Sequence, residues 1–397
     1  MEQSHGPGTV SPSLGARHEP LASPASEVEN SPNSPGSLGE ARTSLSWLLN
    51  QIYTISYLIF FSILGTLARL GIQALTAYPD TPIIFASIWP NFAGSLVMGF
   101  LSEDSMLFRD IHSVSNNGED SAGSKQAHAA LKKTIPLYIG LATGFCGSLT
   151  SFSAFMRDTF LALSNDFQSS SFQEQQLGPP PRNGGYTFLA LLAVPITTIS
   201  LSLSGLFLGA HLAAALTPFT PALPRALVRG LLNPLVVLLG WGCWLGAVLM
   251  TALPPAGHID WRGKVTFALV FAPLGCLARF YISLWLNKRV PTFPLGTFAV
   301  NIAGTGVLAL AWDLAHSGAG GGGSGVLAVG CQVLAGVQDG FCGCLTTVST
   351  WVAELAALRR KNAYMYGAAS LLGGFATVVA VMGGLRWSGA YEGTACR

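Results

Sequence analysis

Two stretches of the sequence place glycines, hydroxyl residues and aromatic residues inside long apolar runs. They read GFCGSLTSFSAF at residues 144–155 and GFCGCLTTVSTW at residues 340–351. Lipid leaves no water for free backbone groups, so such residues within an apolar run indicate a broken helix that lines a protein-buried or aqueous space. Exposed carbonyls, hydroxyls and ring edges are groups that bind small ions, and we therefore expect a site at these breaks.

The backbone of the two breaks offers oxygen ligands for a cation. Carbonyls around Gly147 to Thr150 and around Gly343 to Thr346 would face each other if the two copies pack together. Four such oxygens suit a small hard cation such as Na⁺. The alternative is that the breaks only satisfy each other through waters and hydroxyls.

Amide and aromatic side chains near the breaks supply groups for an anion. Asn91 and Asn301 each carry two amide donors into a helix that has a glycine three residues later. They indicate pore donors, or else hydrogen bonds between helices worth about 0.6 to 2 kcal/mol. Phe152 and Phe155 lie three residues apart on one helix face. The positive edge of a ring can meet an anion, although aromatic stripes usually belong to a core.

Four charged residues lie within or at the ends of apolar segments. Arg69 and Arg279 each cost at least about 2.5 to 3.5 kcal/mol there unless they face protein, water or an anion. They either raise the potential along an anion path or bind carbonyls of a broken helix. Asp158 and Glu354 follow the two breaks, and each anchors a helix end or lines a vestibule.

The whole chain has the composition of a polytopic membrane protein. Half of its 397 residues are apolar and 10% are charged, against about 25% charged in soluble domains. A net charge of +2 gives no argument for a nucleic-acid partner. Segments long enough to cross about 30 Å of hydrocarbon recur after Leu45. We expect an all-helical protein with nine spans, at residues 54–76, 83–102, 135–162, 186–216, 231–253, 264–287, 295–315, 326–358 and 364–386.

An internal repeat organises these spans. Residues 65–69 (GTLAR) recur at 275–279 (GCLAR), and 91–95 (NFAGS) at 301–305 (NIAGT), both offset by 210 positions. A single linking helix starts the second set of four helices from the opposite side, so we expect inverted repeats with a site near the midplane between them. The expected parts are a disordered tail (1–44), a first repeat (45–216), a linker with the fifth helix (217–260) and a second repeat (261–397).

The distribution of basic residues predicts the orientation. With the N-terminus inside, inner segments hold 13 Lys and Arg residues and outer segments hold 6. Cytoplasmic loops carry the excess, so we expect a cytoplasmic N-terminus and an external C-terminus. The cysteines show no metal-ligand spacing, and we interpret five of them as small core residues, namely Cys146, Cys276, Cys331, Cys342 and Cys344.

These patterns resemble the CrcB/Fluc fluoride channels. The two G-x-x-x-R segments, the two N-x-x-G segments and the duplicated GFCG-x-LT core carry the resemblance over about residues 54–386, and the doubled chain with a linking helix resembles the eukaryotic fluoride exporters called FEX. The resemblance implies a passive, fluoride-selective channel that lets fluoride out of the cytoplasm across the plasma membrane. It also implies a central structural Na⁺ and a monomer that acts as a pseudo-dimer.

We expect the fluoride pore to be lined by Asn91, Phe152, Ser153, Phe155, Asn301, Thr347, Ser349, Tyr366 and Ser370. Arg69, Arg279 and Glu354 are expected as vestibule or structural charges, and the Na⁺ ligands are expected at Gly147, Thr150, Gly343 and Thr346.

The second copy departs from the family pattern. Val348 and Trp351 stand where the first copy has its two phenylalanines. In the last helix the second half keeps Tyr366 and Ser370, whereas the first half has Ile196 at the tyrosine position if Ser200 matches Ser370. We therefore expect only one conducting pore, built from Phe152 and Phe155 of one half and the polar residues of the other.

Two other classes of protein compete with a channel. A proton-coupled secondary exporter also uses inverted repeats, but it needs a titratable residue in the middle of the membrane, and the sequence indicates none apart from the arginines. A membrane enzyme needs a cluster of His, carboxylate or Cys residues within the helices, and none is evident.

Overall fold

In the computed structural model, the described residues are 35–78, 81–112, 130–167, 182–253, 265–317 and 324–388, and the side chains of residues 35–44 and 324–328 are not described. Residues 48–397 form one compact unit. Most of the tail predicted to be disordered and the predicted 318–325 connector lie outside the described residues. The first helix begins at Pro35, inside the segment for which the sequence predicts no structure.

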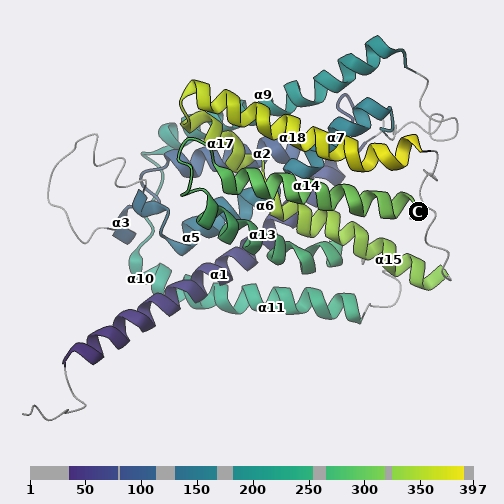
Figure 1. Ribbon diagram of the computed structural model, residues 1–397. Helices are drawn as coiled ribbons and strands as arrows, with labels where there is room; N and C mark the ends of the chain where they lie inside the picture. Colours follow the sequence, from purple (N-terminus) through teal and green to yellow (C-terminus); the bar gives the residue numbers. More distant parts are fainter. Residues whose placement is uncertain are drawn as a thin grey trace, which may run out of the picture. The chain divides into compact units, whose positions relative to one another are not determined.

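The described part of the first half of the chain is almost entirely helical (Figure 1). They are α1 (Pro35–Thr76), α2 (Ile88–Glu103), α3 (Arg109–His112), α5 (Pro136–Ile139), the π-helix η1 (Gly140–Cys146), α6 (Gly147–Leu149), α7 (Phe152–Ser164) and α9 (Gly184–Leu216). The linker region contains α10 (Arg225–Leu227), the π-helix η2 (Val228–Leu232) and α11 (Asn233–Ala252).

The second half repeats the pattern. It contains α13 (Phe267–Leu286), α14 (Leu295–His316), α15 (Ser324–Gly336), the π-helix η4 (Val337–Cys342), α16 (Gly343–Leu345), α17 (Ser349–Ala357) and α18 (Arg360–Trp387). No β-strand occurs within the described ranges. Helices occur within each segment that the sequence predicts to be helical, although α2 begins at Ile88 and not at residue 83. The all-helical class is confirmed.

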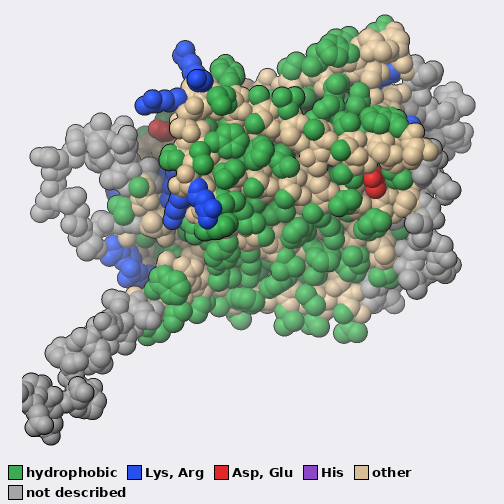
Figure 2. Space-filling view, viewed as in Figure 1, with side chains coloured by type: hydrophobic (Ala, Val, Ile, Leu, Met, Phe, Trp, Pro, Cys, Tyr) green, Lys and Arg blue, Asp and Glu red, His purple; other side chains and the backbone are tan. Residues whose placement is uncertain are grey.

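The surface of these helices is apolar. Seven helices of the described part are long and apolar enough to cross a membrane, whereas α2 has 16 residues. Only 28% of the most apolar window of α9 and 22% of that of the α10–α11 segment are buried within the protein, so both helices present hydrophobic side chains outward. Figure 2 shows hydrophobic side chains over most of one face, with Lys and Arg gathered at one end. This pattern is typical of a multi-pass membrane protein.

The two halves pack through their broken helices. Within each half the second helix packs on the last, α2 on α9 and α14 on α18. Between halves, α7 packs against α14 and α18, and α17 packs against α2 and α9. Each helix that follows a break is therefore held by two helices of the other half.

Candidate functional site

Both breaks interrupt helices at the residues that the glycine and hydroxyl pattern indicates. After α6 the backbone is extended at Thr150 (φ −97°, ψ 150°) and at Ser151 (φ −142°, ψ 119°). After α16 it is extended at Thr346 (φ −98°, ψ 154°). The Ser151 hydroxyl accepts a hydrogen bond from the N–H of Ala154 at 3.2 Å and thereby caps α7. Short extended segments deep in the protein leave backbone groups that other side chains must satisfy.

The two asparagines satisfy part of this need. The Asn91 Oδ1 accepts the N–H of Ser151 at 2.9 Å, and the Asn301 Oδ1 accepts the N–H of Thr347 at 2.9 Å. The Asn301 Nδ2 also donates to the Thr347 carbonyl at 3.2 Å. The Asn91 Nδ2 is buried without a partner among the described residues. Both the oxygen and the nitrogen of the Asn301 amide are thus bonded to its own break, whereas the Asn91 Nδ2 remains available to donate a hydrogen bond to an ion or a water.

Hydroxyls tie the two breaks to each other. The Thr150 Oγ1 lies 3.1 Å from the Thr347 Oγ1 and accepts the N–H of Ser349 at 3.1 Å. Reciprocally, the Thr346 Oγ1 accepts the N–H of Ser153 at 3.0 Å and lies 3.0 Å from the Ser153 Oγ. All five side chains are buried. The breaks therefore satisfy each other through hydroxyls, which is the alternative that the sequence left open beside a cation site.

A sodium ion would use the backbone oxygens that remain at the same place. Gly147, Thr150, Gly343 and Thr346 lie in or beside α6 and α16, which pack on each other. Among the described residues, no backbone hydrogen bond from outside the helices reaches their four carbonyl oxygens. Neutral carbonyl oxygens are ligands that a hard cation accepts, so this donor set fits Na⁺. The described part of the chain has no group of three His, Cys, Asp or Glu residues that would hold another metal.

Each arginine reaches the break of the other half. Arg279 is 3% exposed, and it donates from Nη2 to the Thr143 carbonyl at 2.8 Å and from Nε to the Cys344 carbonyl at 2.7 Å. Arg69 is 2% exposed, and its Nη2 donates to the Asp339 carbonyl. Of the two roles that the sequence proposes for the arginines, these contacts favour binding of helix carbonyls.

The aromatic residues of both copies form one cluster. Phe152 meets Phe155 edge to face, with ring centroids 5.7 Å apart, and it meets Trp351 in the same way at 5.5 Å. All three are buried, as is Val348. Phe152 also lies against Gly374 of α18. Phe152 of the first copy therefore contacts α18, the helix of the second half that carries Tyr366 and Ser370.

The second half joins three of its predicted residues in a chain of hydrogen bonds. The Glu354 Oε2 accepts the Tyr366 hydroxyl at 2.7 Å, and its Oε1 accepts the Thr297 hydroxyl at 2.7 Å. Ser370 is buried on the same helix as Tyr366 and donates to the Tyr366 carbonyl at 2.8 Å. Glu354 is therefore held at a helix end by neutral donors, with Tyr366 as its partner.

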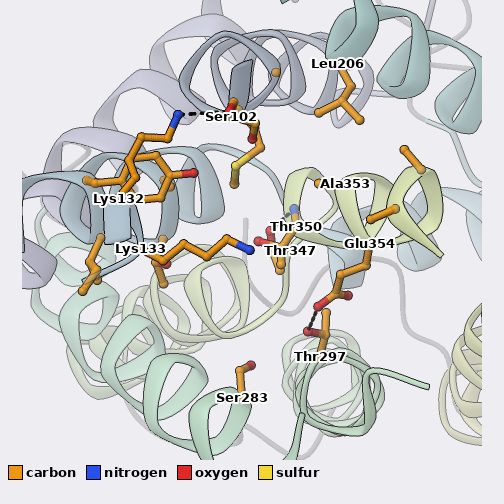
Figure 3. A pocket seen from close by; sticks show the side chains of 18 of the residues that line it. Ser102, Lys132, Lys133, Leu206, Ser283, Thr297, Thr347, Thr350, Ala353 and Glu354 are labelled. Carbon is orange, nitrogen blue, oxygen red and sulfur yellow. Dashed lines mark hydrogen bonds between the residues drawn. The ribbon is translucent and has the colours of Figure 1, made fainter. Parts of the chain in front are cut away.

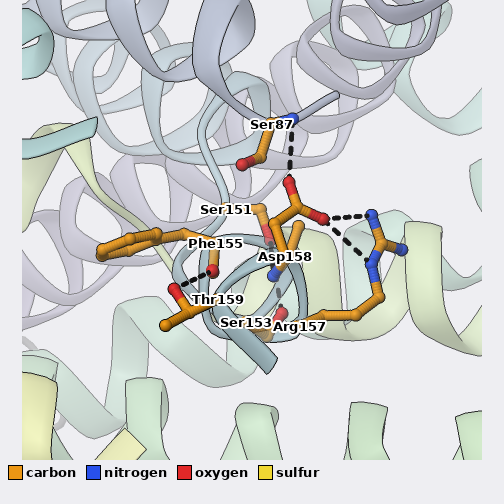
Figure 4. A network of polar contacts seen from close by, with 8 residues as sticks. Ser87, Ser151, Ser153, Phe155, Arg157, Asp158 and Thr159 are labelled. Atoms are coloured by element: carbon orange, nitrogen blue, oxygen red, sulfur yellow. Dashed lines mark hydrogen bonds and ion pairs between the residues drawn. The ribbon is translucent and has the colours of Figure 1, made fainter. Parts of the chain in front are cut away.

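The first-half counterpart is tied differently. Asp158 accepts the N–H of Ser87 at 3.2 Å, and its Oδ1 lies 3.2 Å from the Arg157 Nη2 (Figure 4). It is 2% exposed. Asp158 therefore anchors the start of α2 to α7, one of the two roles expected for it.

The match between the last helices of the two halves needs a correction. Gly205 of α9 lies against Phe92, and Gly373 of α18 lies against Ile302, the residue that the offset of 210 pairs with Phe92. These contacts align α9 with α18 at an offset of 168 positions. In this alignment Thr198 is equivalent to Tyr366, and Ser202 is equivalent to Ser370. Ile196 is 59% exposed, whereas Thr198 and Ser202 are buried. The sequence alignment through Ser200 is wrong because helix periodicity alone leaves the register undecided.

Three functional candidates were missed by sequence reasoning. Asp339 lies half-buried in η4, within the predicted span 326–358, and it was not considered when the sequence was searched for a titratable residue in the middle of the membrane. Lys132 and Lys133 line a cavity of about 730 Å³ together with Glu354, Thr347 and other residues (Figure 3). The signal for the lysines was present in the sequence, because they immediately precede the third predicted span.

Lys132 is bound to the end of α2. Its Nζ donates to the carbonyls of Leu101 at 2.8 Å, Ser102 at 3.0 Å and Asp104 at 2.7 Å. Burial lowers the pKa of the Lys132 ammonium below 10.5, and the nearby Asp104 carboxylate opposes that shift. The lysine thus satisfies carbonyls that a helix end leaves without partners.

One cysteine differs from the sequence interpretation. Cys146, Cys276, Cys342 and Cys344 are free and buried, as expected of small core residues. Cys331 is disulfide-bonded, so its interpretation as a small core thiol is wrong.

Comparison with known proteins relates the chain to one family. A family model described as "CrcB-like protein, Camphor Resistance (CrcB)" matches residues 56–210 and 266–384. The chain is 60% identical to fluoride export protein 1 of Neurospora crassa over 89% of this chain and 70% of that protein. It is 33% identical to fluoride export protein 1 of Candida albicans, over 82% and 78% of the two chains. A bacterial protein, the fluoride-specific ion channel FluC of Chlorobium chlorochromatii, is 30% identical over 32% of this chain and 97% of its own. No solved structure matches.

Proposed function

The chain belongs to the CrcB-like protein family, and from that premise we propose that it is a fluoride-selective channel that lets fluoride leave the cytoplasm passively across the plasma membrane. Membership in this family makes it a membrane transport protein and not an enzyme. The relatives named as fluoride export proteins and as a fluoride-specific ion channel support fluoride as the ion.

The observation that carries this proposal is a buried centre in which aromatic rings and hydroxyl side chains come from the same short stretch of chain. Fluoride is small and strongly hydrated, and it must exchange its water for hydrogen-bond donors and positive edges. Phe152, Phe155 and Trp351 form one edge-to-face cluster, and Ser153, which lies between the two phenylalanines in the sequence, is hydrogen-bonded to Thr346. The unpartnered Asn91 Nδ2 adds a donor. An anion that loses water there finds replacement partners.

We infer that the fold is a nine-span pair of inverted repeats. Reciprocal contacts support this arrangement: Arg69 donates to the carbonyl of Asp339, and Arg279 donates to that of Thr143. Asp339 and Thr143 are 196 positions apart, the same offset as the two GFCG stretches. A pseudo-two-fold axis predicts that each contact between the halves has an equivalent in which the roles of the two halves are reversed. A single chain with such an axis acts as a pseudo-dimer.

The proposed orientation has the N-terminus in the cytoplasm. The excess of Lys and Arg in the segments assigned inside supports it. The disulfide at Cys331 gives independent support, because disulfides persist in oxidising compartments and are rare in the cytosol. In the nine-span order Cys331 lies near the external end of its span, where a disulfide is chemically stable.

We further propose a structural Na⁺ held by the carbonyls of Gly147, Thr150, Gly343 and Thr346. Support comes from the packing of α6 on α16 and from the neutral oxygen donors there. Such an ion would supply a fixed positive charge that joins the two breaks. The surrounding hydroxyl bonds hold the breaks together independently of the ion.

A single conducting pore is proposed, with Phe152 and Phe155 on one wall and Tyr366 and Ser370 on the other. The packing of α7 against α14 and α18 supports a pore made from both halves. With the offset of 168, Leu206 stands at the position equivalent to Gly374, which lies beside Phe152. Trp351 stands at the position equivalent to Phe155, and both Leu206 and Trp351 are buried. A leucine in place of a glycine and a tryptophan in place of a phenylalanine disfavour a second path.

The proposal is tested with purified protein in liposomes. We expect fluoride to leave loaded vesicles down its electrochemical gradient and chloride to remain, with no dependence on an imposed proton gradient. The competing function is a proton-coupled exporter, and Asp339 in η4 is the observation that favours it. Uphill fluoride movement driven by a proton gradient, and lost in Asp339→Asn, would establish the exporter instead.

A further inference from the structure

The cavity of about 730 Å³ lies among α2, α9, α13, α14 and α17 and is also lined by the segment before α5. Its lining includes three cationic side chains, Lys132, Lys133 and Arg279, and two carboxylates, Glu103 and Glu354. Figure 3 looks into this cavity and shows side chains from both halves of the chain around it. By formal charge the lining is therefore slightly positive.

Two of the three cations are committed to the protein. The Lys132 Nζ donates to three carbonyls between 2.7 and 3.0 Å away and is buried. Arg279 donates to the carbonyls of Thr143 and Cys344. Hydrogen bonds to charged groups of this kind hold the side chain in place. Neither side chain can move to contact an ion in the cavity without breaking these hydrogen bonds.

Lys133 differs from both. It is exposed, and within the described residues it makes no hydrogen bond or ion pair. Figure 3 shows its chain extended across the cavity, with the ammonium directed toward Thr347 and Thr350. Both threonines line the cavity, and the Thr347 Oγ1 is hydrogen-bonded to Thr150 in the other break at 3.1 Å. The Lys133 ammonium is therefore directed from the cavity wall toward the second break.

Glu354 lies on the opposite wall of the cavity, and its negative charge weakens the binding of an anion there. Its two oxygens are already bound to the Thr297 and Tyr366 hydroxyls at 2.7 Å, so it is fixed while Lys133 is not. An ion must bind well enough to enter a pore and weakly enough to leave it. An ammonium without a hydrogen-bond partner among the described residues, facing a carboxylate that is already hydrogen-bonded, meets both conditions.

We propose that Lys133 is the positioning residue that concentrates fluoride in this cavity and brings it to the hydroxyls of Thr347 and Thr350. This inference rests on the proposed fluoride conduction and adds to it the residue and the route of entry. An ammonium is a compact, strongly hydrated charge on a flexible stem, so it attracts the anion without removing all of its water. Charge at the mouth of a low-dielectric cleft raises the local concentration of a counter-ion by about tenfold or more.

The test compares neutral variants at two ionic strengths. Full-length parent, Lys133→Gln, Lys133→Arg and Lys361→Gln are reconstituted, and the initial fluoride efflux is measured at subsaturating fluoride. Lys361 is an exposed cation outside the cavity, so its variant controls for net charge. We expect Lys133→Gln to lower efflux about three- to tenfold at about 10 mM salt. At about 0.5 M inert salt the loss should fall below about twofold, because screening shortens the reach of the charge to a few Å.

Charge rescue separates the proposed role from a structural one. Lys133→Cys is treated with a cationic or an anionic methanethiosulfonate reagent, and Cys243→Ser is included because Cys243 is an exposed free thiol. The cationic reagent should restore efflux and the anionic one should lower it further. Lys133→Arg should keep at least half of the parent's efflux.

The outcomes are distinct. If Lys133→Gln matches Lys361→Gln at low salt while the parent conducts fluoride, the role of Lys133 is overturned and the channel remains. The same holds if both reagents act alike. A parent that moves no fluoride overturns the proposed function and this inference together.

Discussion

The guanidinium of Arg279 lies directly against the α-carbon of Gly147, so that a β-carbon there would overlap its Nη1. Arg69 and Gly343 are placed in the same way. Each arginine is carried by the first helix of one half and reaches a glycine in the break of the other, and this pair of contacts joins the halves at the site.

The first prediction is that the glycine and the arginine act as one structural unit. Gly147→Ala should destabilise the protein by about 1 to 3 kcal/mol because the guanidinium must move, and Arg279→Gln should do so by about 2 to 4 kcal/mol because two buried carbonyls lose a charged donor. Thermal unfolding in detergent measures both. Gly242→Ala in α11, where nothing lies within 4 Å of the added carbon, should leave the midpoint unchanged or higher. A midpoint in Gly147→Ala equal to that of Gly242→Ala would argue against the contact.

The second prediction concerns the single pore. Phe152→Ile or Phe155→Ile should abolish the fluoride resistance that the protein gives to a sensitive host, because the isoleucine has no positive ring edge. Val348→Ala should leave resistance nearly intact. Protein levels in the membrane are compared by blotting, since all three side chains are buried. Equal losses in the three variants at equal expression would refute the single-pore proposal.

The third prediction is that Glu354 and Tyr366 act together. Tyr366→Phe removes the hydroxyl that donates to Glu354 at 2.7 Å, and Glu354→Gln removes the charge that accepts it. Each should lower fluoride efflux about tenfold, which corresponds to about 1.4 kcal/mol on the barrier. The double variant should lose little more than either single one, because residues of one hydrogen-bonded pair are not additive. If the fold-loss of efflux in the double variant equals the product of the two single losses, the two residues act independently.

The fourth prediction tests the sodium proposal. Exchange of Na⁺ for a large organic cation should lower the thermal midpoint of the purified protein, because an ion that binds only the folded state stabilises it. The effect should saturate with Na⁺ concentration. Thr150→Ser keeps both the hydroxyl and the carbonyl and serves as the matched control. A midpoint that is independent of Na⁺ at equal ionic strength would remove the ion from the proposal.

The fifth prediction concerns Lys132. Lys132→Met should destabilise the protein by about 2 to 3 kcal/mol, because three carbonyls at the end of α2 lose a charged donor. The pKa of Lys132 is lowered in the folded protein, so the unfolded chain binds more protons just below pH 10.5. This effect makes stability rise with pH in that window, and the methionine variant should lack it. Stability measured against pH in both proteins provides the check, and identical slopes would contradict it.

Composition and local pattern were enough to predict the class of protein, the positions of the helices and the two breaks. Apolar length and the scarcity of charge indicate spans because hydrocarbon imposes the same demand on every such helix. The break at Thr150 could be predicted for a local reason, since clustered glycines weaken a helix and neighbouring hydroxyls can satisfy the backbone groups that a break frees. The offset of 210 pairs Asn91 with Asn301 without any knowledge of contacts.

Which groups meet depended on how the two halves pack. From the sequence, Arg69 and Arg279 could either raise the potential along an anion path or bind carbonyls of a broken helix. The carbonyls that they bind in the other half are 270 and 136 positions away in the sequence. The register of α9 against α18 was not predictable, because a helix shifted by about half a turn keeps much the same composition while its buried face changes. Thr198 and Ser202 became evident only from the contacts of Gly205. The sequence alone indicates Lys133 as a charge that sets orientation, and only the folding of its segment over the cavity gives that charge a place beside the broken helices.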